Sequence, residues 1–129
     1  MDFPLRITPL LRPLLFPLRA TGERAVARVG TGRIEVEFGV LFRGRFPLEQ
    51  VEHVGHDAWP WWGGLGVRLG TRGRAYVLGS SQGVVRLHFT RPQRVYAPIP
   101  WRCSELYLSL HDPGGFIATV QAEALMAAA

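Results

Sequence analysis

Two short stretches of alternating residues constrain the fold of this chain more than any other feature. Residues 33–38 (RIEVEF) alternate charged and apolar side chains, and residues 84–89 (VVRLHF) alternate apolar and polar side chains from Val85 onward. In the first stretch, Ile34, Val36 and Phe38 share one face and charged side chains occupy the other. A period of two is typical of a half-buried strand, which has one face against the core and the other in water. The chain is therefore expected to form an antiparallel sheet.

Further apolar segments between turn residues predict the other strands. They cover residues 3–7, 24–30, 40–46, 74–79 and 106–110. Residues 48–54 predict a turn followed by a short strand. Val67 and Leu69 flank an outward Arg68, which is also the pattern of a strand. The glycine and serine residues around 80–83 predict a hairpin loop between strands 74–79 and 84–89. Three prolines predict a long irregular connection over residues 91–102.

The last segment of the chain has the pattern of an amphipathic helix over residues 113–126. Asp112 is a favoured N-cap residue and Pro113 suits the first helical position. Phe116, Val120 and Ala124 lie one turn apart and form an apolar stripe. Several strands followed by one helix predict a mainly β fold of the α+β class, in which the helix covers the open end of a bent sheet.

The length of 129 residues is that of a single domain. Residues 1–22 are expected to form a strand and Pro-rich turns, residues 24–110 a β sandwich, and residues 113–126 the helix. Prolines 4, 9, 13 and 17 interrupt the apolar N-terminus, which argues against a signal peptide. A lone cysteine, Cys103, fits a reducing cytoplasm.

The charges are unevenly distributed along the chain. The net charge is +5, and all 15 basic residues are arginines. Residues 58–104 contain seven arginines and no acid, whereas residues 105–129 contain three acids and no base. Such a basic block can attract the phosphates of lipid or nucleic acid, or it can simply be a solvated face. The sequence leaves both interpretations open.

Three segments together resemble bacterial pleckstrin-homology-like (PH-like) domain proteins of the small actinobacterial type. They are RIEVEFGVLFRGRFPLEQVEHV, RGRAYVLGSSQGVVRLHF and ELYLSLHDPGGFIATV, and the likeness covers about residues 24–126. The resemblance implies a bent antiparallel sandwich or partly open barrel of about seven strands, with the C-terminal helix plugging one end. It also implies a role in binding phosphoinositides, peptides or proteins. The loop at 30–32 has only Arg28 and Arg33 beside it, which departs from the basic motif of the phosphoinositide binders.

Two groups of residues are candidates for binding a partner. If the apolar residues of strands 67–69, 74–79 and 84–89 face the core, one outer face carries Arg68, Arg74, Tyr76, Arg86 and His88, with Arg72 in the turn beside it. That face could bind an anion or a partner. The second group is Trp59, Trp61 and Trp62, which could wedge into a membrane or a partner groove, or could instead cap the open end of the barrel.

No motif in the sequence predicts catalysis, a metal site or a cofactor. His53, His56 and Asp57 form H-x-x-H-D without a third ligand at a suitable spacing. Cys103 follows Arg102, but adjacent residues of an extended chain point apart. Ser80 and Ser81 fit turn chemistry rather than a nucleophile elbow.

The sequence therefore predicts a non-enzymatic PH-like binding or scaffold module. The expected partner is another protein or a second copy of the chain, with peripheral contact to an anionic membrane as a secondary role. The alternative is a small-ligand carrier or enzyme that uses a cavity inside the bent sheet. Binding of nucleic acid is a weaker alternative, because only one aromatic residue is predicted on the basic face.

Overall fold

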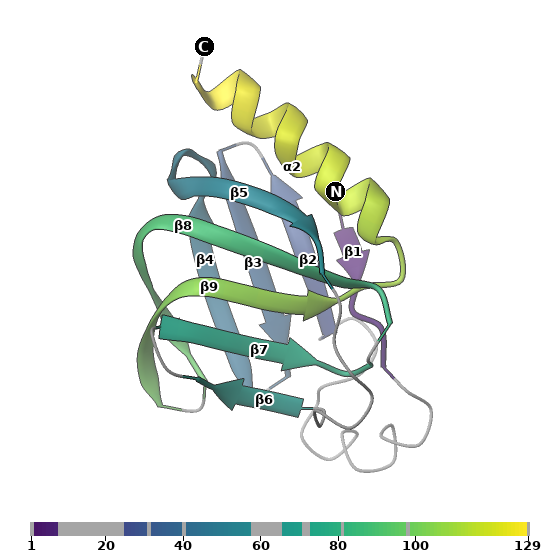
Figure 1. Ribbon diagram of the computed structural model, residues 1–129, viewed down its shortest axis with the longest axis vertical. Coiled ribbons are helices and arrows are strands. Elements are labelled where there is room, and N and C mark those ends of the chain that lie inside the picture. Colours follow the sequence, from purple (N-terminus) through teal and green to yellow (C-terminus); the bar gives the residue numbers. More distant parts are fainter. Residues whose placement is uncertain are drawn as a thin grey trace.

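A computed structural model describes residues 2–7, 25–30, 32–39, 41–57, 66–70, 73–80, 82–97 and 99–128. Its elements, in chain order, are β1 (Asp2–Pro4), β2 (Ala25–Gly30), β3 (Arg33–Phe38), β4 (Phe42–Pro47), the 3-10 helix η3 (Leu48–Gln50), β5 (Val51–His56), β6 (Gly66–Leu69), β7 (Arg74–Leu78), β8 (Val84–Tyr96), β9 (Pro100–Ser109) and α2 (Pro113–Ala128). The predicted class, mainly β with a C-terminal helix, is confirmed (Figure 1). The described residues form nine strands where about seven were predicted.

The strands form two layers that share one long strand. The first layer contains β1, β2, β3 and β4, and the second contains β5, β8, β9, β7 and β6. The two sets of strands cross steeply in Figure 1. Strand β8 belongs to both layers, because residues near its start pair with β5 and residues at its end pair with β4. The sheet is therefore an open, strongly bent sandwich.

The irregular connection predicted for residues 91–102 is wrong, because strands β8 and β9 form a long hairpin there. Val95 pairs with Trp101 and Tyr96 pairs with Pro100 close to the turn. Pro92 lies where the β8–β9 register shifts, between His88 and Gln93, and Pro100 is the first residue of β9. Both are positions at which a sheet tolerates proline. The prolines therefore shape the hairpin without preventing it.

The expectation that every pair of strands is antiparallel is also wrong at one position. Strands β7 and β9 pair in parallel, with Arg74 opposite Glu105 and Val77 opposite Leu108. Strand β9 lies between β7 and β8, so the predicted hairpin between β7 and β8 is wrong and the chain crosses the end of β9 between these two strands. Leu110 N–H donates to the Gly83 carbonyl at 2.8 Å. Gly83 has a φ of 67°, and a Cβ there would collide with the Leu110 carbonyl, so the crossing favours glycine.

Phenylalanine side chains fill the space between the layers. Phe38, Phe42, Phe46 and Phe89 are fully buried, and the rings of Phe46 and Phe89 stack with centroids 4.6 Å apart. The alternation in residues 33–38 is confirmed, since its three apolar side chains are buried and Arg33 is exposed. The core therefore contains the side chains that the period-two pattern selects.

Helix α2 begins as the sequence predicts and packs beside β5, η3 and β2. Gly115 N–H donates to Asp112 Oδ1 at 3.0 Å, which confirms the N-cap. Phe116 and Val120 are buried, and Phe116 meets Phe3 of β1 edge to face with ring centroids 5.4 Å apart. The described helix ends at residue 128, slightly beyond the predicted end. Its first half is thus anchored to the sandwich.

Candidate binding surfaces

The basic face predicted from the sequence exists on the outer side of β7, β9 and β8. Tyr76 lies opposite Tyr107, which in turn lies opposite Arg86. The two tyrosine rings stack with centroids 4.8 Å apart. In the next row, Arg74 lies opposite Glu105 and Glu105 lies opposite His88. Arg74, Tyr76 and Arg86 therefore do share one face.

Carboxylates from outside the basic block offset the arginines of this face. Arg74 Nε is 3.7 Å from Glu105 Oε2, and Arg86 Nε is 4.0 Å from Asp57 Oδ2. Glu105 Oε1 is also 3.4 Å from His88 Nδ1. Exposed ion pairs of this kind add little stability, but they place both signs of charge on one surface. The face is consequently of mixed charge.

Hydrogen bonds within this face also shift the pKa values of two of its residues. Tyr107 Oη donates to Glu105 Oε2 at 3.1 Å. Burial, followed by this hydrogen bond, raises the pKa of Tyr107 above its usual value. A side-chain hydrogen bond with Tyr76 raises the pKa of Arg74. These residues are therefore already engaged with one another.

The other predicted site residues lie wholly or partly outside the described residues. Trp59, Trp61, Trp62 and Arg72 are not among them. Arg68 belongs to β6, where it lies opposite Tyr76, but only its backbone is described. The two interpretations of the tryptophans therefore stay predictions.

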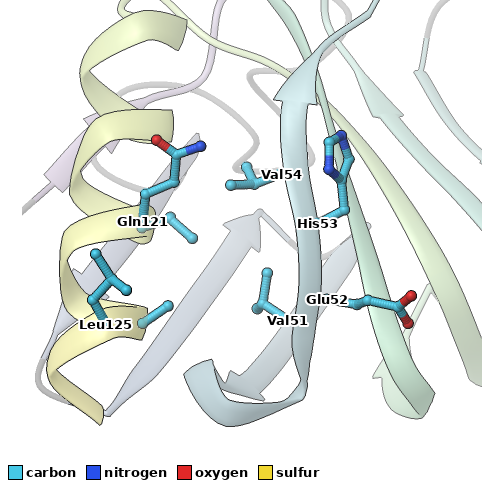
Figure 2. A pocket seen from close by; sticks show the side chains of 8 residues that line it. Val51, Glu52, His53, Val54, Gln121 and Leu125 are labelled. Atoms are coloured by element: carbon cyan, nitrogen blue, oxygen red, sulfur yellow. The ribbon is translucent and has the colours of Figure 1, made fainter. Parts of the chain in front are cut away.

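A groove that the sequence analysis did not predict lies between β5 and the second half of α2. It has a volume of about 420 Å³ and is lined by Val51, Glu52, His53, Val54, Val120, Gln121, Ala124 and Leu125. Figure 2 shows Val51 and Val54 projecting from β5 toward α2, whereas Glu52 and His53 project from the other side of the strand. The amide of Gln121 extends from α2 toward β5. The groove thus has an apolar floor and a polar rim.

The far end of α2 leaves two large apolar side chains uncovered, and one of them, Leu125, lines this groove. Leu125 is 75% exposed and Met126 is 71% exposed. The predicted stripe of Phe116, Val120 and Ala124 is buried only over its first two members, and Ala124 is half-buried in the groove wall. The sequence pattern identified the stripe, but the point at which the sheet stops covering it depends on tertiary packing.

A second surface that the sequence analysis missed is the tip of the β8–β9 hairpin. Tyr96 is 47% exposed and Ile99 is 54% exposed. Arg94 lies opposite Arg102 two pairs further from the turn than Tyr96 and Pro100, and both arginines are exposed. The alternation of Arg94, Val95 and Tyr96 is a strand signal, but the surrounding prolines outweighed it.

Three of the residues considered for catalysis or metal binding are buried or engaged with another residue, whereas His53 and His56 are exposed. Cys103 is fully buried, and burial raises the pKa of its thiol to about 12. Asp57 pairs with Arg86, and the Ser80 hydroxyl accepts a hydrogen bond from Gln82 N–H at 3.1 Å. Across the described ranges, no three His, Cys, Asp or Glu side chains cluster as a metal ion would need.

No family model, curated protein or solved structure matches this chain. In the part of the chain that the structure describes, no helix has the length and apolar character needed to span a membrane. The surfaces described above are therefore the basis for the functional argument.

Proposed function

We propose that the protein is a non-enzymatic binding module that makes protein–protein contacts, and that the groove between β5 and α2 is the contact site. The observation that carries this proposal is the apolar groove itself, whose wall includes the exposed side chain of Leu125. Apolar side chains that are exposed together beside a groove are typical of interaction sites.

The charges around the groove favour a particular kind of partner. Glu49 of η3 and Glu52 of β5 are exposed, and Glu123 of α2 is half-buried. Neither η3, β5 nor α2 contains an arginine or lysine. Of these acids, Glu52 is the one that lines the groove. The fitting occupant is a segment of another protein that combines apolar side chains with lysine or arginine, because its charges complement the net negative charge of these three elements.

The packing of the interior supports a surface role over the alternative of an internal ligand cavity. Phe38, Phe42, Phe46 and Phe89 occupy the space between the layers that such a cavity would need. The ion pairs on the predicted basic face likewise reduce its attraction for nucleic acid. The PH-like resemblance and a cytoplasmic location are part of this proposal and rest on the sequence alone.

The proposal can be tested with a displayed peptide library. The library is selected against the wild-type protein, and the affinity of the enriched peptides is then measured by fluorescence anisotropy. Enriched peptides should combine leucine or aromatic residues with lysine or arginine. Leu125→Ser should weaken their binding about tenfold or more, since burial of a leucine side chain contributes about 1.5–3 kcal/mol.

Ile99→Ser is the matched control, because it removes an exposed aliphatic side chain of the same size from the hairpin tip. This variant should bind the peptides as the wild type does. Peptides that bind both variants with wild-type affinity would contradict the groove as the contact site. Light scattering on the peptide-free protein tests the second-copy alternative; a dimer that Leu125→Ser dissociates would assign the groove to self-association instead.

Contact with an anionic membrane is a second candidate function. The exposed apolar and cationic side chains of the hairpin tip favour it.

A further inference from the structure

The tip of the β8–β9 hairpin combines apolar and cationic side chains in the manner of a membrane-docking loop. Tyr96, Ile99, Leu125 and Met126 are the large apolar residues that are most exposed within the described ranges. The last two belong to α2, so Tyr96 and Ile99 of the hairpin form a separate site. The bent ends of β8 and β9 lie at the lower left of Figure 1, on the other side of the molecule from α2.

Arginines surround this apolar tip. Arg94 and Arg102 face each other directly across β8 and β9, and Arg43 of β4 lies opposite Tyr96. Like charges that are directly opposite in a sheet are destabilising, so this arrangement gains stability from an anion. Glu37 lies opposite Arg43 in β3, but no ion pair joins any of these three arginines to an acid within the described residues.

The pair Arg94 and Arg102 also borders a hollow whose side chains carry hydrogen-bond donors but no acceptors. The hollow has a volume of about 390 Å³ and is lined by Arg94, Val95, Pro100, Trp101 and Arg102. Trp101 packs against the core, on the opposite face of the hairpin from these two arginines. The guanidinium groups of Arg94 and Arg102 only donate hydrogen bonds, so they match the oxygens of an anionic headgroup.

We propose that the hairpin tip docks onto a membrane surface rich in anionic phospholipid, with Ile99 and Tyr96 in the interfacial region and Arg94 and Arg102 on headgroup phosphates. An exposed isoleucine beside tyrosine and arginine suits the boundary between lipid and water. A free phosphate would use the arginines but not the apolar tip, which favours the lipid surface. This inference rests on the second candidate function and assigns it to different residues from the predicted Trp59, Trp61 and Trp62.

The test is co-sedimentation of the full chain with vesicles of two compositions, phosphatidylcholine alone and equimolar phosphatidylcholine and phosphatidylserine. The variants are Ile99→Ser, Arg94→Gln and Arg102→Gln, and circular dichroism confirms that each is folded. Leu125→Ser is the control for loss of an exposed apolar side chain. Arg33→Gln is the control for loss of an exposed charge, because Arg33 lies at the other end of the outer face of the first layer.

The wild-type protein should bind the anionic vesicles and not the neutral ones. Each hairpin arginine variant should lower the partition coefficient about fivefold, which is the contribution of one basic residue near an anionic surface. Ile99→Ser should lower it several-fold, and both controls should match the wild type.

Three results would overturn the inference, and they differ in what they leave standing. If the wild-type protein does not bind anionic vesicles, both the membrane function and the docking role of the hairpin are excluded. Binding that the hairpin variants leave unchanged would keep the membrane function but move it to another surface. Release from the vesicles by inorganic phosphate, but not by chloride at the same ionic strength, would assign the arginines to a free anion.

Discussion

Cys103 shows how strand geometry decides the chemistry of a single residue. The sequence places the thiol next to Arg102, a neighbour that could lower its pKa. In β9 the two side chains point to opposite faces, so Arg102 is exposed and Cys103 is buried in the core. Burial disfavours the thiolate and raises the pKa to about 12. The sequence argument that neighbours on a strand point apart therefore holds at this position.

The raised pKa predicts how stability depends on pH. The unfolded thiol ionises near its ordinary pKa of about 8.5–9, whereas the folded thiol stays protonated. The contribution of Cys103 to stability is therefore complete below pH 8 and is lost as the pH rises toward about 12.

Urea unfolding at several pH values between about 8 and 11 measures this contribution. The free energy of unfolding should fall by about 1.4 kcal/mol per pH unit more in the wild type than in Cys103→Ala. Other groups with raised pKa values, such as Tyr107, are present in both proteins and cancel in the difference. Parallel pH profiles for the two proteins would show that the thiol is not buried in the folded state.

At the scale of the element, the sequence predicted those segments in which one local pattern dominates. The alternation of residues 33–38 and 84–89 placed two strands correctly, and Asp112 with Pro113 placed the start of α2. Residues 91–102 were mispredicted because proline was weighed without knowing its position in a sheet. At a register shift or a strand start, proline forfeits no ladder hydrogen bond.

Two adjacent glycines in the first turn of α2 should respond differently to the same substitution. A Cβ on Gly114 would meet open space, whereas a Cβ on Gly115 would collide with the carboxylate of Asp112. Gly114→Ala should raise the free energy of unfolding by about 0.5–1 kcal/mol, because alanine favours the helix. Gly115→Ala should gain less or lose stability, because its methyl group displaces the capping carboxylate, whose hydrogen bond contributes about 1 kcal/mol.

Thermal unfolding followed by circular dichroism compares the two substitutions directly. Adding Asp112→Ala should remove the difference between them, because the cap is then absent in both. Equal effects of Gly114→Ala and Gly115→Ala with Asp112 present would show that the carboxylate does not cap the helix.

At the scale of the whole molecule, the sequence could not predict which elements meet. Alternation reports which side chains are buried, but it does not report the partner strand, so the insertion of β9 between β7 and β8 was missed. The candidate surfaces likewise depend on which strands pair. The shared face of Arg74, Tyr76 and Arg86 came from strand periodicity, but the acids Glu105 and Asp57 that offset it came from pairing. The groove exists only because α2 extends past the edge of the sheet beside β5.

The central claim is that a partner segment binds between β5 and α2. Titrating a library-selected basic, apolar peptide into methyl-labelled protein and recording NMR spectra tests it most directly. The account predicts that the methyl signals of Val51, Val54 and Leu125 shift with one common dissociation constant while that of Ile99 stays in place. A shift of the Ile99 signal with those of Val51, Val54 and Leu125 unmoved would contradict it.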